Sequence, residues 1–211
     1  MADIPFRLAA PLAERLRTAA DVEGKLVRAL ESLGPLAGRD VALLDVPGGR
    51  SLDLLATAGI TVQSFPLTDP LRLGVPDASL DAVVSLWSGF RGVAEMDLAE
   101  VDRALRPGGR LLVVHDYGRD DVSTLADPDA LEYRSWSRRE GPFLSGGGFK
   151  VRVVHCFWTF TSIEEARGFL EEAFGERGAA AAAVLKRPRL AWNIAVYHRW
   201  RGGAAPGRAV E

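Results

Sequence analysis

The chain has 211 residues, of which 47% are hydrophobic and 26% are charged, and this composition is typical of one large folded domain. Its formal net charge of −2 argues against nucleic acid and anionic membranes as partners. The N-terminus lacks a secretory pattern, and no apolar run is long enough to span a bilayer, so we expect a cytoplasmic protein. Cys156 is the single cysteine and the three histidines lack metal-ligand spacing, so neither a disulfide nor a metal site is expected.

Helical and strand patterns alternate through the first half of the chain. The predicted helices cover residues 7–20, 22–33, 51–58 and 94–105, and the predicted strands cover residues 41–46, 60–65, 81–87 and 110–116. Such alternation predicts parallel strands that are joined by right-handed helical crossovers.

The last third of the chain has a different rhythm. It is predicted to form a helical stretch at 122–140, a strand at 150–160, a helix at 163–174, a separate alanine-rich helix at 179–185 and a strand at 190–200. Ser162 and Glu165 have the spacing of a capping box, and Gly175 marks the end of the helix that they begin. We expect residues 1–201 to form a single domain, with helices in the N-terminal segment 1–38 and a flexible tail at 202–211.

The stretch VALLDVPGG at 41–49 ends a buried strand in Asp45 and turns through Pro47, Gly48 and Gly49 into a helix. Glycine lets the backbone approach a ligand, and the start of the next helix offers unpaired N–H groups and a positive dipole end. Open α/β sheets bind their ligands at the carboxyl ends of strands, so a nucleotide-like ligand would suit this turn. A turn that serves only packing would use the same glycines, and this interpretation stays open.

Three stretches together resemble the class I S-adenosylmethionine-dependent methyltransferases, and they span about residues 40–116: LLDVPGGRSLDLLATAGITV, VPDASLDAVVSLWS and LAEVDRALRPGGRLLVVHD. They are similar to that family's motifs at its first, fourth and fifth strands, and the C-terminal elements are similar to its antiparallel pair. The resemblance implies an α/β fold, with a Rossmann-like, doubly wound, mostly parallel sheet and an antiparallel C-terminal strand. It also implies S-adenosylmethionine as the cofactor.

The sequence departs from that family in three respects. Its spaced glycines fall here on Pro47, Gly49 and Ser51, and the acid that ends its second strand falls on Phe65. Only residues 66–80 separate the second strand from the next predicted one, whereas each parallel crossover needs about a dozen residues. We therefore expect the family's third strand to be missing or rudimentary.

The resemblance implies a cofactor site whose members lie at strand ends and in the proline-broken stretch. These are Asp45, Pro47, Gly48, Gly49, Asp69, Ser85, Leu86 and Trp87. Asp69 would replace the missing acid of the second strand, and a solvated turn aspartate is the alternative. If the protein's own side chains fill the hollow beside Gly48, then Phe65, Leu71 and Leu73 are expected to do so.

Candidate catalytic residues end the strand at 110–116. His115 is the best base by residue type, Asp116 would orient it or bind an amine, and Tyr117 would donate a hydrogen bond. Strand alternation that points His115 away from Asp116 would break this pairing, and a histidine that only caps the sheet is the alternative. Tyr133, Trp136 and Arg139, at helical spacing, are the residues predicted to contact substrate.

The resulting hypothesis is a methyltransferase that acts on an unidentified small molecule. The main alternative is a catalytically inactive relative, a pseudoenzyme that keeps the sheet as a ligand-binding or homodimer-forming scaffold. A dinucleotide oxidoreductase is a third hypothesis, disfavoured because the turn lacks a third spaced glycine and the second strand lacks a terminal acid.

Overall fold

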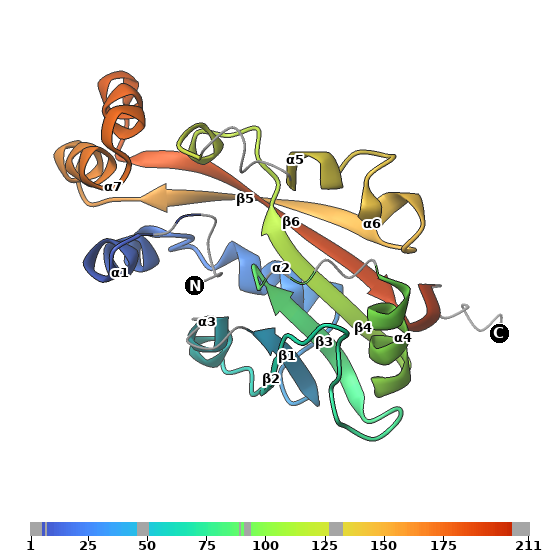
Figure 1. Ribbon diagram of the computed structural model, residues 1–211. Coiled ribbons are helices and arrows are strands. Elements are labelled where there is room, and N and C mark those ends of the chain that lie inside the picture. Colours follow the sequence, from blue (N-terminus) through green and yellow to red (C-terminus); the bar gives the residue numbers. More distant parts are fainter. Residues whose placement is uncertain are drawn as a thin grey trace, which may run out of the picture.

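The computed structural model describes residue 6 and residues 8–45, 51–88, 90, 94–126 and 133–203. Within these residues the strands form one six-stranded sheet, in the order β2-β1-β3-β4-β6-β5 (Figure 1). The strands are β1 (Val41–Asp45), β2 (Gln63–Pro66), β3 (Leu80–Leu86), β4 (Leu105–Asp116), β5 (Lys150–Thr159) and β6 (Arg189–Trp200). The first four run parallel, while β6 is antiparallel to both β4 and β5. The predicted Rossmann-like α/β architecture is confirmed.

Helices cover both faces of this sheet. They are α1 (Ala10–Ala19), α2 (Lys25–Leu33), α3 (Ser51–Thr57), α4 (Glu95–Ala104), α5 (Tyr133–Trp136), α6 (Pro142–Ser145) and α7 (Ile163–Val184), with 3-10 turns η1 (Val122–Thr124) and η3 (Arg201–Gly203). Figure 1 shows α4, α5 and α6 on one side of the sheet, with α2 on the other. Among the described residues, no helix has both the length and the apolarity required to cross a membrane.

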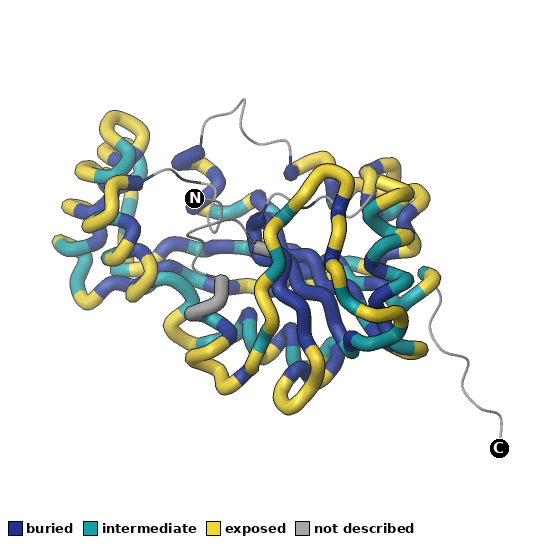
Figure 2. The backbone as a smooth tube through the Cα atoms, turned by 60° about the horizontal axis from the view of Figure 1, so that its bottom comes forward, coloured by how far each residue is buried: buried dark blue, intermediate teal, exposed yellow. Residues whose placement is uncertain are grey.

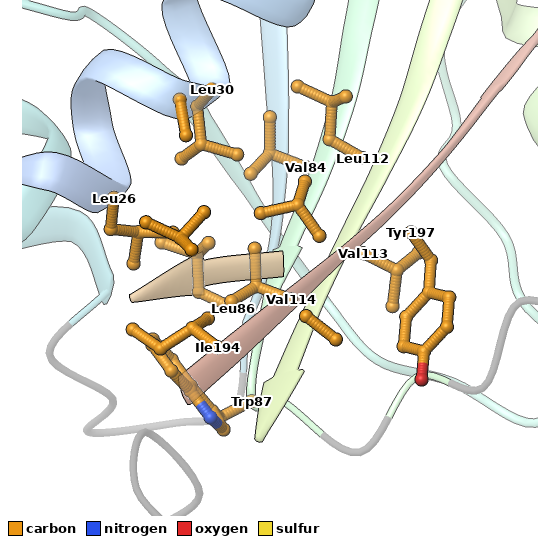
Figure 3. Close-up of a cluster of buried hydrophobic side chains, with 14 of the residues drawn as sticks. Leu26, Leu30, Val84, Leu86, Trp87, Leu112, Val113, Val114, Ile194 and Tyr197 are labelled. Carbon is orange, nitrogen blue, oxygen red and sulfur yellow. The ribbon is translucent and has the colours of Figure 1, made fainter. Parts of the chain in front are cut away.

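The central strands are buried on both faces, as parallel strands between two helical layers require. Figure 2 shows them as a dark blue centre inside more exposed helices and loops. On one face, Leu26 and Leu30 of α2 lie over Val84 of β3 and Leu112 of β4 (Figure 3). On the opposite face, the ring of Phe143 stacks on Tyr197, with ring centroids 4.1 Å apart.

No strand lies between β2 and β3 in the described chain, in agreement with the expected loss of the third strand. The connection is held instead by α4, where Asp97 and Glu100 accept the N–H groups of Leu71 and Leu73 at 3.0 and 2.8 Å. The Arg103 guanidinium, together with the N–H of Leu73, lowers the pKa of Glu100 to about 2. Side chains three residues apart share a helix face, so one face of α4 replaces the hydrogen bonds of a neighbouring strand.

The helical stretch predicted at 122–140 is wrong for the described residues, which contain only η1, α5 and the turn that follows α5. Residues 127–132 lie outside the described residues. The chain before η1 is instead tied to β6, because Asp121 accepts the N–H of Ala191 at 2.8 Å and Asp120 accepts that of Asn193 at 2.7 Å. These two hydrogen bonds hold residues 120 and 121 beside β6, in place of the predicted helix.

The two helices predicted around Gly175 are present within α7. Gly175 has φ 55° and ψ −130°, a conformation that breaks the helix and favours glycine. After this break, Gly178 is buried against the first half of α7. The alanine-rich half therefore folds back onto the half that precedes it.

The capping box at the start of α7 gives a first prediction. Ser162 Oγ accepts the N–H of Glu165 at 3.0 Å, and Glu165 accepts the N–H of Thr161 at 2.9 Å. Ser162→Ala is expected to lower the free energy of unfolding by about 1 kcal/mol, because an N–H at the helix end loses its partner. Denaturant titration measures this, with Ser162→Asp as the cap-preserving control. Equal stability of the alanine variant and the wild type would contradict it.

Candidate functional site

The carboxyl ends of β1, β3 and β4 meet at the point where the strand order reverses. From β1 the chain crosses to β2 on one side, and β3 then pairs with β1 on the other side. Leu44 is in register with Ser85, which places the end of β1 at Asp45 beside the end of β3. Ligands of open α/β sheets bind at such a switch point. Pro47, Gly48 and Gly49, which follow β1, lie outside the described residues.

The end of β3 is buried and has an uncommon backbone conformation. Ser85 Oγ lies 2.6 Å from Ser88 Oγ, and Leu86 is fully buried. Trp87 has φ 50°, a left-handed conformation that is rare for bulky residues and is found more often at functional sites. Its backbone N–H donates to the carbonyl oxygen of Val114 of β4 at 3.0 Å, which holds the residue at the edge of the sheet.

Asp116 ends β4 beside two indole rings. Its Oδ1 accepts the N–H of Trp192 at 2.7 Å, and the rings of Trp192 and Trp87 stack with centroids 5.6 Å apart. Asp116 is 4% exposed, and burial raises its pKa to about 7, with a further contribution from the charge of Asp120. The indole N–H groups of Trp192 and Trp87 act in the opposite direction and favour the charged carboxylate, although Trp87 Nε1 makes no hydrogen bond of regular geometry.

His115 lies on the opposite face of β4 from Asp116, because successive strand residues point to opposite faces. Its Nε2 is 3.1 Å from the carbonyl oxygen of Phe90, and its ring meets Trp136 edge to face at 4.6 Å. Asp116 therefore does not orient His115, and the proposed pairing is absent. The histidine joins the end of the sheet to Phe90 and α5, as the sheet-capping alternative predicts.

The three predicted substrate residues are not brought together. Tyr133 and Trp136 are buried in α5, whereas α5 ends at Trp136 and leaves Arg139 exposed in the following turn. Tyr133 is close enough to Asp116 and Asp120 for burial and these two charges to raise the pKa of its phenol. Tyr117 is half-buried beneath the Arg119 guanidinium, which lies 5.6 Å from its ring centroid.

The proline-broken connection between β2 and β3 holds Asp69, which was expected to replace the missing acid of the second strand. This residue is exposed, in a turn where Thr68 Oγ1 accepts the N–H of Arg72 at 3.0 Å. Leu71 and Leu73 are buried in the hydrophobic core, and Phe65 packs against that core. Gly48, beside which they were expected to lie, is outside the described residues.

Trp192 and Asp120 are site residues that the sequence did not single out. Only the antiparallel register of β6 with β4 brings Trp192 to Asp116. A signal was present in the run DYGRDD at 116–121, where Asp116 is followed by Asp120 and Asp121. Among the described side chains, no group of three or more His, Cys, Asp or Glu residues is placed to hold a metal ion.

The strand order, with its reversed β6, defines a Rossmann-like α/β fold of the kind that class I methyltransferases have. No protein-family model and no curated protein matches the chain. Similar solved structures include a proposed type II methyltransferase from Anaeromyxobacter dehalogenans, 19% identical over 81% of this chain and 94% of that chain, with a TM-score of 0.48.

Two further solved structures are similar at the same level. A proposed methyltransferase from Haloferax volcanii, in complex with the Trm112 methyltransferase activator, is 19% identical over 89% of this chain and 94% of that chain, with a TM-score of 0.47. A proposed sarcosine dimethylglycine methyltransferase from Galdieria sulphuraria is 15% identical over 93% of this chain and 92% of that chain, with a TM-score of 0.45. These similarities concern the fold, and what this chain binds depends on its own side chains.

Proposed function

We propose that this protein is an S-adenosylmethionine-dependent methyltransferase that acts on a small molecule. The observation that carries the proposal is the convergence of Asp45, Trp87 and Asp116 at the carboxyl ends of three adjacent parallel strands, at the switch point of the sheet. The buried indole N–H of Trp87 acts on Asp116 without a hydrogen bond of regular geometry, so it remains able to donate to a polar ligand.

The cofactor would lie over the end of β1. The residues proposed to contact it are Asp45, the turn Pro47-Gly48-Gly49, Ser85, Leu86 and Trp87, with Asp69 at the rim. When bound, S-adenosylmethionine supplies an electrophilic methyl group on a sulfonium. A methyl transfer depends largely on the alignment of the acceptor with that group, so rigid walls at the strand ends suit it.

The chain's own residues would then position the acceptor. Asp116 is the proposed proton acceptor, because a pKa of about 7 lets it gain or lose a proton at neutral pH. Tyr133 lies within reach of its charge, and Trp136 forms the wall with His115. Because His115 contacts the Phe90 carbonyl oxygen and the ring of Trp136 in α5, its proposed role is to position α5 rather than to move a proton.

Calorimetric titration with S-adenosylhomocysteine tests the proposed function. We expect binding in the micromolar range, and we expect Asp45→Asn to weaken it at least tenfold. Glu176→Gln is the matched control, because Glu176 is exposed on the far half of α7. Absence of binding at millimolar ligand would overturn the proposal. The inactive alternative predicts binding without transfer of a labelled methyl group to any acceptor.

A further inference from the structure

The carboxyl group of Asp116 is incompletely paired although it is buried. Oδ1 accepts the hydrogen bond from Trp192, whereas Oδ2 is buried and has no hydrogen-bond partner. Buried polar atoms in folded proteins are nearly always paired, so this oxygen is available to accept a hydrogen bond from a bound group.

Neither protonation state of Asp116 resolves this by itself. If the group is ionised, the Trp87 indole N–H favours the charge without a hydrogen bond of regular geometry. No cation among the described residues forms an ion pair with it, and Asp120 adds a second negative charge nearby. If the group is protonated, its hydroxyl has no acceptor. A ligand that brings both an N–H donor and a positive charge would satisfy the ionised form.

The basic groups nearest in the fold are occupied elsewhere. Arg134 donates to Ser123 at 3.3 Å, and Arg119 lies over the ring of Tyr117. Asp120 cannot turn toward a ligand easily, because its two oxygens accept the N–H groups of Ser123 and Asn193, each at 2.7 Å. The surroundings of Asp116 therefore have a negative potential that no cation in the described part of the chain neutralises.

The two indoles hold the carboxylate in a fixed place. Trp87 and Trp192 lie nearly parallel, at 15°, and the N–H of Trp192 donates to Oδ1. The carboxylate is therefore held rigidly, and its own charge is what would attract a positively charged nitrogen.

We propose that the methyl acceptor is an amine, bound by its nitrogen at Asp116 between the ends of β3 and β4. This assignment rests on the proposed methyltransferase function. The amine enters as an ammonium and gives one proton to the Asp116 carboxylate. Its freed lone pair forms a bond to the methyl carbon, and the bond from that carbon to sulfur breaks with its electron pair left on sulfur. Asp116 then releases its proton to solvent.

The test compares primary and secondary amines with alcohols of the same carbon skeleton, benzylamine with benzyl alcohol among them. Binding is followed by tryptophan fluorescence, with and without S-adenosylhomocysteine, and labelled methyl transfer is measured in parallel. We expect at least one amine to bind at least tenfold more tightly than its alcohol and to become methylated. Asp116→Asn should remove this preference, while Glu176→Gln should keep it.

The two proposals fail in different ways. If S-adenosylhomocysteine binds but no amine is preferred, or if Asp116→Asn keeps the preference, the amine assignment is overturned alone. If S-adenosylhomocysteine does not bind, the proposed function fails and the acceptor role of any bound amine fails with it. Trp192→Phe, which retains a ring but loses the N–H to Asp116, gives a second measure and should weaken amine binding several-fold.

Discussion

Asp116→Asn is expected to raise the free energy of unfolding above pH 7 while it abolishes methyl transfer. In the folded protein, burial raises the pKa of Asp116 from 3.8 to about 7, so the folded state binds a proton that the unfolded state has already released. Stability from this group is fully present below pH 4 and is lost as the pH rises to 7. At 1.36 kcal/mol per pKa unit the loss amounts to about 4 kcal/mol.

Denaturant titrations of the wild type and of Asp116→Asn between pH 4 and 8 measure this effect. The difference between variant and wild type should grow with pH and become constant above pH 7, because other titrating groups such as Glu100 are common to both. Asp120→Asn is the contrasting variant: it should destabilise by about 1–3 kcal/mol, because its oxygens accept two backbone N–H groups. A difference for Asp116→Asn that does not change with pH would contradict the prediction.

Gly178→Ala is expected to have the second large effect. A Cβ at this position would overlap the carbonyl oxygen of Leu170 and come within 3.1 Å of Phe174 Cβ. Because the nearest obstacle is backbone, the alanine-rich half of α7 has to move away from the first half. We expect a loss of about 3 kcal/mol, at the upper end of the usual cost of overpacking.

Gly168→Ala is the matched control within the same helix. A Cβ there meets nothing within 4 Å, so alanine should stabilise the protein by about 0.5–1 kcal/mol through its higher helix propensity. Thermal unfolding and amide exchange of residues 176–184 measure both variants. Similar stability of the two alanine variants would refute the close packing of the halves.

The sequence predicted the strands well and one connecting segment badly. Strands such as β1 and β3 are buried on both faces, so they appear as short continuous apolar runs, and the flanking turn residues identify them as strands. The absence of the third strand was predicted from the length of the chain between β2 and β3, because so few residues cannot form two parallel crossovers and a strand. The segment 122–140 failed because Asp120 and Asp121 bond to β6, and a partner distant in sequence cannot be found from local pattern.

The sequence predicted the positions of the candidate site residues more accurately than it predicted which residues they contact. His115, Asp116 and Trp87 do lie at the ends of adjacent strands, as their positions implied. That Asp116 pairs with Trp192, and His115 with Phe90, depends on strand register and on which face each residue occupies. Arg139 was misplaced because the helix that was to carry it stops at Trp136.

The loss of the third strand has a consequence for self-association. It leaves β2 outermost on one side of the described sheet, and exposed strand edges are templates on which other copies can add strands. Here that edge is four residues long and ends at Pro66, while the opposite edge, β5, exposes Lys150, Arg152 and His155. Both borders thus discourage continuation of the sheet into a neighbouring molecule, so the sheet edges are poor surfaces for a dimer of this chain.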